Sequence, residues 1–231
     1  MATGIPFTAD EFFGVFARYN TETWPASLVL AAAGWAVVLL AALGRRHAGR
    51  IAAAWLALLW LWMGVVYHLI YFRSINPIAA AFGAAFILQA ALLFRTALRG
   101  ELRFTGSLEE RGDWGTVVLF YGLLVYPWIG TALGHRYPAA PTFGVPCPTT
   151  IYTLGLLLWS SGRIPVSLLI VPTAWTIIAA SATVLFGVWQ DLGLPVAMLV
   201  TIVVAVRRSR TRSADDRVLA GPAPGPRHRP A

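Results

Sequence analysis

The chain has 231 residues, of which 58% are hydrophobic and only 12% charged, and its mean hydropathy is +0.67. Soluble domains carry about a quarter charged residues, roughly twice the share found here, and the high apolar content excludes a disordered or collagen-like chain. The single cysteine excludes a disulfide scaffold. These quantities predict a protein that lies mostly in lipid.

All eighteen basic residues are arginine. Retinal and pyridoxal phosphate attach through a lysine, and a Walker-type phosphate loop needs one, so the absence of lysine excludes all three. The formal charge of +8 at pH 7 does not indicate a nucleic-acid partner. The arginines fall in short clusters between apolar runs, which is typical of membrane topology.

Region 1–24 predicts an amphipathic helix. Thr8 and Glu11 fit a capping box, in which each side chain satisfies a free backbone N–H. Aromatic residues follow at helical spacing and form one apolar face, namely Phe12, Phe13, Phe16 and Tyr19. We expect this helix to lie in the interface plane on the periplasmic side.

Residues 25–207 predict the membrane domain, an all-α bundle of seven transmembrane helices. The apolar segments are 27–43, 51–72, 77–98, 114–134, 146–161, 165–187 and 192–206. Gln89, near the middle of the third segment, predicts a hydrogen bond between helices because a polar group in lipid needs a partner.

The fifth apolar segment is short for a membrane span. A spanning helix needs about 20 residues, and four prolines in loop 135–150 bar a longer helix, namely Pro138, Pro141, Pro146 and Pro148. We therefore expect the fifth helix to begin below the outer surface and the loop to dip inward as a re-entrant segment.

The distribution of arginine predicts the orientation. If the N-terminus is outside, fifteen arginines lie on the inner side and only Arg18, Arg73 and Arg136 on the outer side. The positive-inside rule therefore predicts an N-out, C-in topology.

The tail 208–231 differs in composition from the bundle. A basic cluster marks its start, namely Arg207, Arg208, Arg210 and Arg212. It suits anionic lipid headgroups, although a plain stop-transfer signal is favoured over a regulated lipid switch. Prolines and glycines from position 221 onward then predict a disordered cytoplasmic tail.

Polar residues collect at the predicted outer ends of the helices, namely His68, Arg73, Asn76, His135, Arg136, Cys147 and Asp191. His68, His135 and Cys147 offer ligands for a metal ion, whereas Arg73 and Arg136 would attract an anion. A helix N-terminus would favour a Cys147 thiolate. The alternative is structural, since a lone cysteine is often an apolar filler and a buried histidine an interior hydrogen-bonding group.

Three stretches resemble those of a family of bacterial multi-pass membrane proteins that is classified only as a domain of unknown function. They are Trp-Leu-Trp-Met-Gly-Val-Val-Tyr-His at 60–68, Ile-Asn-Pro at 75–77 and the proline-rich loop 135–150. The resemblance covers most of the chain, from about Pro6 to the end of the seventh helix. It implies the bacterial cytoplasmic (inner) membrane and transfers no catalytic roles.

We therefore expect a non-enzymatic membrane protein that handles a small solute, an anion or a metal ion at a periplasm-facing site, as a transporter would. One alternative is a membrane enzyme with Cys147 as nucleophile or redox thiol and His135 as base. Another is a structural accessory subunit whose outer loop docks a partner. Besides the lipid bilayer, a homo-oligomer or a membrane partner stays open.

Overall fold

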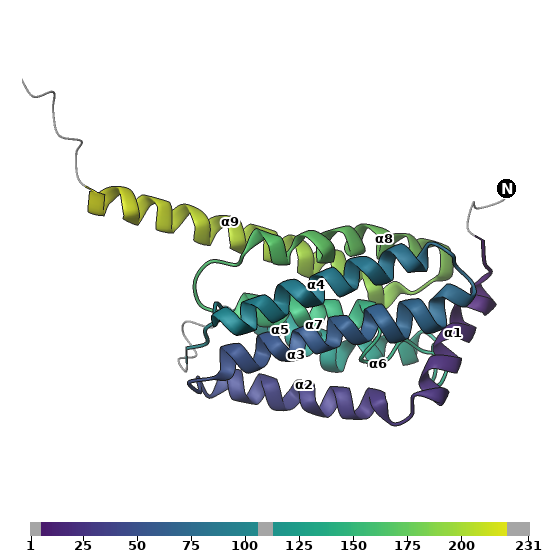
Figure 1. The fold of residues 1–231 in the computed structure, drawn as a ribbon. Helices are drawn as coiled ribbons and strands as arrows, with labels where there is room; N and C mark the ends of the chain where they lie inside the picture. Colours follow the sequence, from purple (N-terminus) through teal and green to yellow (C-terminus); the bar gives the residue numbers. More distant parts are fainter. Residues whose placement is uncertain (1–5, 106–112, 221–231) are drawn as a thin grey trace, which may run out of the picture.

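A computed structural model describes residues 6–105 and 113–220 of the chain. Every element of regular structure in these two stretches is a helix. The long helices run side by side, α1 crosses one end of the bundle, and α9 extends past the other end (Figure 1). We call these the cap end and the arginine end.

The helices follow the apolar segments closely. Their bounds are α1 Ala9–Glu22, α2 Ala26–Ala42, α3 Ala48–Trp62, η1 Met63–Tyr71, η2 Phe72–Ser74, α4 Ala79–Arg99, α5 Asp113–Phe120, η3 Tyr121–Val125, α6 Tyr126–Ala132, α7 Pro146–Trp159, η4 Val166–Leu168, α8 Ile170–Phe186, η5 Trp189–Leu192 and α9 Gly193–Ala220. Of the short η elements, η1 and η3 are π-helical turns that continue α3 and α5.

The predicted number of seven spans is not confirmed. In the described residues, five helices are long and apolar enough to cross a membrane, namely Ala48–Ser74, Ala79–Arg99, Trp114–Ala132, Val166–Phe186 and Trp189–Thr211. A sixth span arises only if α1 and α2 are counted together across their 80° bend. The seventh fails on length, because α7 has only 14 residues.

The outer surface of the bundle is apolar. Large aliphatic side chains on four helices are more than half exposed, including Leu28 and Leu39 on α2, Leu88 and Leu98 on α4, Ile177 and Val184 on α8, and Val196 and Leu199 on α9. Soluble monomers rarely expose apolar surface on this scale. This surface, together with the long apolar helices, supports placement of the bundle in a membrane.

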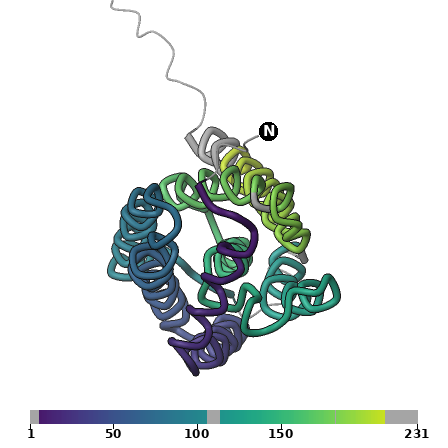
Figure 2. The backbone as a smooth tube through the Cα atoms, turned by 90° about the vertical axis from the view of Figure 1, so that its right-hand side faces the viewer, coloured from purple at the N-terminus to yellow at the C-terminus, as the bar shows by residue number. Residues whose placement is uncertain are grey.

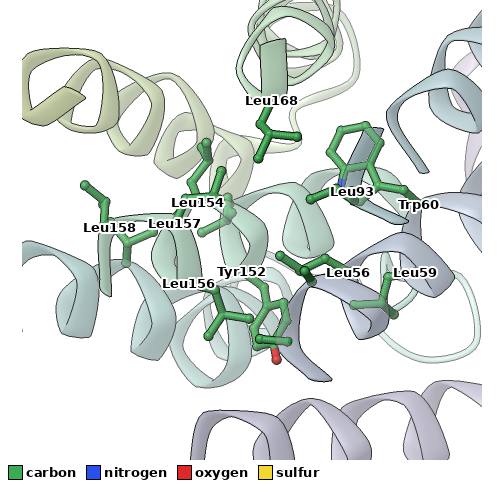
Figure 3. Packing of buried hydrophobic residues seen from close by; sticks show 14 of the residues in the cluster. Leu56, Leu59, Trp60, Leu93, Tyr152, Leu154, Leu156, Leu157, Leu158 and Leu168 are labelled. Carbon is green, nitrogen blue, oxygen red and sulfur yellow. The ribbon is translucent and has the colours of Figure 1, made fainter. Parts of the chain in front are cut away.

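Helix α7 occupies the centre of the bundle. Seen along the bundle, the other long helices form a ring around it (Figure 2). Every residue of α7 except Cys147 is buried. Leucines of α7 pack against Leu56, Trp60 and Leu93 from α3 and α4 (Figure 3). The short fifth helix predicted from the sequence is thus present, enclosed by protein.

Polar contacts fix α7 at its middle and at its C-terminal end. Tyr152 donates a 2.9 Å hydrogen bond to the carbonyl of Gly34, and Trp60 donates one of 3.0 Å to Thr153. At the far end, the Arg208 guanidinium donates to the carbonyl oxygens of Leu158 (2.8 Å) and Ser160 (2.7 Å). Arg208 therefore binds the C-terminal carbonyls of α7, where a cation is favourable.

The observed length of α9 differs from the predicted boundary of the tail. Instead of becoming irregular at residue 208, α9 continues as a helix to Ala220. The reason is that no proline or glycine interrupts the chain until position 221, and arginine, alanine and leucine favour helix. The rest of the predicted tail, 221–231, lies outside the described residues.

The capping box at the start of α1 is confirmed. The Thr8 amide donates to Glu11 Oε2 at 2.7 Å, and the Glu11 amide donates to Thr8 Oγ1 at 3.3 Å. These hydrogen bonds lower the pKa of Glu11, because they favour its charged form. The apolar face of α1 packs on the bundle itself, with Phe12, Phe16 and Tyr19 buried.

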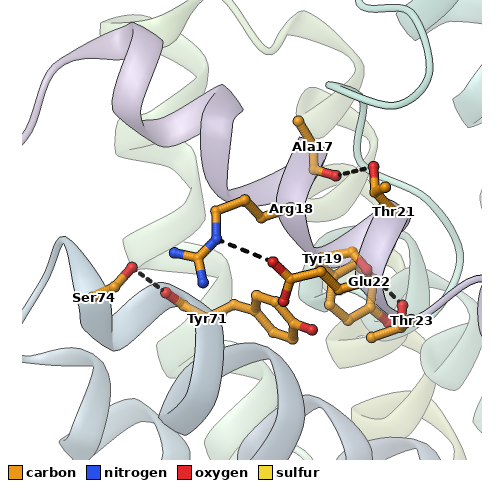
Figure 4. A network of polar contacts seen from close by, with 8 residues as sticks. All are labelled: Ala17, Arg18, Tyr19, Thr21, Glu22, Thr23, Tyr71 and Ser74. Atoms are coloured by element: carbon orange, nitrogen blue, oxygen red, sulfur yellow. Dashed lines mark hydrogen bonds and ion pairs between the residues drawn. The ribbon is translucent and has the colours of Figure 1, made fainter.

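The C-terminal half of α1 is tied to its surroundings. Asn20 donates to the carbonyls of Pro138 (2.6 Å) and Ala140 (2.8 Å) and accepts from Thr142 (2.7 Å), which holds the proline-rich loop under α1. On the exposed side, Arg18 pairs with Glu22 at 3.5 Å beside Tyr71 (Figure 4).

The predicted hydrogen bond of Gln89 is confirmed. Its Nε2 donates to the carbonyl of Leu168 at 3.0 Å, which joins α4 to η4 in the buried interior.

Candidate functional site

A cavity of about 130 Å³ lies beneath α1 at the cap end. We call it the cap cavity. Most of its wall is aromatic, formed by Phe7, Phe12, Phe16, Tyr67, Phe72, Phe82, Tyr126, Trp175 and Phe186. Its remaining polar lining consists of Cys147, Ser181 and Asp191. Small-molecule sites have this character, an apolar wall with a few polar groups.

The outer wall of the cap cavity is formed by stacked phenylalanines. The rings of Phe12 and Phe186 stack with centroids 4.7 Å apart, and Phe7 stacks on Phe186 at 5.6 Å. Phe16 stacks on Tyr67 at 5.8 Å, so α1 contacts η1 as well as α8. The capping box begins α1 at the residue after Phe7. It therefore positions Phe7 relative to the phenylalanines of α1.

Asp191 supplies the only carboxylate of the cap cavity. It lies in η5 and is 3% exposed. The Tyr126 hydroxyl donates to its Oδ1, and the Cys147 side chain faces the same carboxyl group. In the described stretches neither arginine nor histidine forms an ion pair with it. A buried carboxylate thus has only neutral protein partners.

The short helix η5 is held in place by η3 and α6. The Tyr121 hydroxyl donates to the Gln190 carbonyl oxygen. Gly193 lies against the ring of Tyr121, where an added Cβ would come within 2.0 Å of Cε1. A side chain at this position would displace the turn that carries Asp191.

Cys147 lies at the start of α7, as predicted, and faces the cap cavity. Its side chain is partly exposed, and both the Asp191 carboxyl and the Trp175 indole are adjacent. A neighbouring carboxylate opposes a second negative charge. Burial raises the pKa of the Cys147 thiol, and the Asp191 carboxyl raises it further, so the thiolate that a helix N-terminus would favour is disfavoured.

His68 lies one residue layer behind the wall of the cap cavity. The residue is fully buried in the π-helical turn η1, and neither ring nitrogen has a hydrogen-bond partner among the described residues. Its nearest rings are Phe86 at 4.6 Å and Trp175 at 5.2 Å between centroids. Trp175 and Tyr67 contact His68 and also line the cavity.

His135 belongs to a second, neighbouring cavity of about 120 Å³. Its ring stacks on Phe13 at 4.8 Å, and its Nδ1 lies 3.3 Å from Nε2 of Gln190. Tyr126 and Pro141 line both cavities and so form a shared partition.

The remaining predicted site residues lie outside the cap cavity. Arg73 and Arg136 are exposed at the surface. Asn76 is buried, and its Oδ1 accepts a 3.2 Å hydrogen bond from the amide of Ile78, directly before α4. Its observed contact is therefore structural.

Of the seven predicted residues, the structure brings Cys147 and Asp191 together. The metal set of His68, His135 and Cys147 is not assembled: the described residues contain no group of three His, Cys, Asp or Glu side chains that could hold a metal ion. The reason is that His68 is enclosed by aromatic rings, whereas His135 faces Gln190 in the other cavity.

Sequence reasoning missed the aromatic lining and Tyr126. One signal was present for the carboxylate: Asp191 is the only acidic residue between Asp113 and Asp215. An isolated acid between two apolar helices is costly, so it marks a functional position more strongly than the nearby arginines do.

The comparisons with known proteins give one match. Residues 9–216 match a family described as a family of unknown function, DUF6064. No curated protein and no solved structure matches the chain. The match covers nearly all of the described helices and confirms the resemblance to an uncharacterised family. The chain therefore belongs to the DUF6064 family.

Proposed function

We propose that this membrane protein binds a small organic cation, such as a protonated amine or a quaternary ammonium, in the cap cavity. The observation that carries the proposal is the buried Asp191 carboxylate in an aromatic cavity without a cationic protein partner. A carboxyl group buried in this way either takes up a proton or needs a countercharge to offset its desolvation. An organic cation would supply it.

The aromatic wall favours the same ligand class. Faces of tryptophan, tyrosine and phenylalanine attract cations, by about 2 kcal/mol when the contact is desolvated. Trp175, Tyr126 and Tyr67 lie on the cavity wall together with Asp191. An anion would face this carboxylate and no arginine, so the anion alternative loses its support.

The size of the cap cavity limits the ligand. A water molecule takes up about 30 Å³ in the liquid, so a cavity of about 130 Å³ corresponds to roughly four waters. A solute with a handful of non-hydrogen atoms fits this space. Tetramethylammonium and choline lie within this range, whereas a peptide or a nucleotide does not.

Entry requires α1 to move. The aromatic wall closes over the cavity from the N-terminal half of α1, while Asn20 fixes the C-terminal half to the loop below. The Arg18–Glu22 pair joins two residues of α1 and does not tie the helix to the bundle. We infer that α1 swings as a lid about its C-terminal end.

The orientation forms part of the proposal. The cap end carries Arg18, Arg73 and Arg136, whereas the other arginines whose side chains the structure describes, such as Arg45, Arg99 and Arg208, belong to segments toward the opposite end. By the positive-inside rule we place the cap end outside the bacterial inner membrane. The ligand would then enter from the periplasm.

The test is a pair of ligands that differ in charge but not in shape. Choline and its neutral carbon isostere 3,3-dimethylbutanol are titrated into the purified full chain in nanodiscs, with tryptophan fluorescence as the readout. We expect saturable binding of choline alone, lost in Asp191→Asn and kept in the exposed control Asp10→Asn. Equal binding of the neutral isostere, or unchanged choline binding by Asp191→Asn, would overturn the proposal.

The thiol-enzyme alternative rests on the partial exposure of Cys147 to the cavity. Its predicted base, His135, lies across the partition in the second cavity. Labelling of Cys147 by a small maleimide tests this alternative. A reactive thiol would be modified while α1 covers the cavity, whereas an unreactive thiol would be modified only after α1 is displaced.

A further inference from the structure

We propose a second binding site, specific for phosphate groups, at the arginine end of the bundle. The site is a polar pocket of about 360 Å³. Five arginines line it, namely Arg45, Arg46, Arg50, Arg99 and Arg103. We call it the arginine pocket. The ligand is a phosphate group, carried by an anionic phospholipid or present as a free phosphate.

The arginine pocket is a formed structure at the meeting point of three chain segments. Its lining comes from the α2–α3 turn with the start of α3, from the end of α4, and from residues 100 and 102–104 beyond α4. Gly49 lies so close to the next segment that an added Cβ would be 1.8 Å from the carbonyl oxygen of Leu102. Gly100 has a φ of 64°, and a Cβ there would come within 3.0 Å of Arg50 Nε. The close contact between the backbones at Gly49 and Leu102 therefore brings the segments that carry these arginines together.

The arginines of the pocket are largely uncompensated within the described residues. Arg99 pairs with Glu101 at 3.7 Å, and the other four have no ion-pair partner in the described stretches. The first turn of α3 contains no acidic residue and has no side-chain cap, so its dipole adds to the positive potential. Like charges gathered in one pocket repel each other unless an anion binds between them.

Guanidinium groups match phosphate oxygens geometrically. Arginine forms two parallel N–H···O bonds to a phosphate, which a carboxylate-poor, open pocket of this size can accommodate. The pocket also adjoins an apolar surface: Leu39 and Leu43 near the end of α2, and Phe94 and Leu98 near the end of α4, are more than half exposed. A phospholipid would place its phosphate among the arginines and its acyl chains along these residues.

The experiment uses the purified full chain and two forms of phosphate. Nanodiscs of phosphatidylcholine with and without phosphatidylglycerol test the lipid by native mass spectrometry, and pyrophosphate in phosphatidylcholine nanodiscs tests the free anion. We expect Arg50→Ala to weaken retention of whichever form binds by about tenfold. The matched control Arg73→Ala, an exposed arginine at the cap end, is expected to bind as the parent does.

Two further variants separate a binding effect from a folding effect. Arg46→Ala removes a charge from the turn without touching Gly100, and Arg50→Lys keeps the charge but loses the paired hydrogen bonds. Both should melt as the parent does and still bind several-fold more weakly. Retention of phosphatidylglycerol alone identifies the lipid as the source, and retention of pyrophosphate identifies the free anion. Unchanged binding in all three variants, or equal loss in Arg73→Ala, would overturn the proposal without bearing on choline binding at the cap end.

Discussion

The two ends of the bundle handle charge in opposite ways. At the cap end, one carboxyl group lies among aromatic rings in a more enclosed cavity of about 130 Å³. At the arginine end, five guanidinium groups line a more open pocket of about 360 Å³. A single enclosed charge attracts its ligand strongly because little water screens it. Exposed charges each attract a ligand weakly, so several are needed for tight binding. The difference teaches that affinity at the cap end depends on enclosure, and at the arginine end on charge density.

The strongest way to break this comparison is Gly49→Ala. The new methyl carbon would lie 1.8 Å from the Leu102 carbonyl oxygen. Because this oxygen belongs to the backbone, no side-chain rotation can relieve the overlap. We expect a loss of about 3 kcal/mol in the free energy of unfolding, seen as a lower melting temperature, together with loss of the arginine pocket.

Gly14→Ala is the matched control for this variant. An added Cβ at Gly14 meets nothing within 4 Å, and the position is in α1. Alanine should raise helix stability there by about 0.5–1 kcal/mol. If both variants lower the melting temperature equally, close packing at Gly49 is not the cause.

The next largest effect is expected for Asp191→Asn. A charged hydrogen-bonding partner contributes about 1.5–3 kcal/mol, so choline affinity should fall by about ten- to one-hundredfold. Phosphate retention at the arginine end should be unchanged. A parallel loss at both ends would show that the two sites are not independent.

The Arg208→Ala variant tests whether Arg208 stabilises the fold without taking part in phosphate binding. Its guanidinium donates to the α7 carbonyls of Leu158 and Ser160. Removing it should cost about 2 kcal/mol in unfolding free energy, measured by chemical denaturation, with phosphate binding retained. Loss of phosphate binding at unchanged stability would contradict this assignment.

The smallest expected effect concerns the lid. Hydrogen bonds from Thr8 lower the pKa of Glu11 below its ordinary value of 4.5. The folded state therefore gains stability from Glu11 above the ordinary pKa and loses it as the pH falls through the lowered one. Hydrogen exchange of the first α1 amides should accelerate in acid in the parent and be independent of pH in Glu11→Gln, after correction for intrinsic exchange. Equal acid acceleration in both proteins would exclude the capping box as its cause.

Much of the helical pattern could be predicted from the sequence, because it depends on local signals. Each of the seven apolar segments contains a helix, and the capping box of Thr8 and Glu11 is present. Gln89 finds the partner that its place in an apolar helix requires. These features follow from hydropathy and short-range hydrogen bonding alone.

The candidate site could be predicted only in part. Asp191 and Cys147 were both singled out, but their contact depends on the position of α7 inside the ring. Hydropathy does not distinguish a helix surrounded by protein from one surrounded by lipid, because both environments are apolar. For this reason α7 resembled a span in the sequence. The sequence also did not show that the His68 ring is surrounded by aromatic side chains.

The position of α7 constrains the order in which the chain is assembled. With no side facing the bilayer and only 14 residues, this helix gains little by entering lipid alone. Its contacts with α8 and α9 cannot form until those helices have been made. The helices α8 and α9, made afterwards, close the ring and supply Arg208. Nascent chains that stop before α9 should therefore leave this segment outside the membrane interior, accessible to proteases until the last helix arrives.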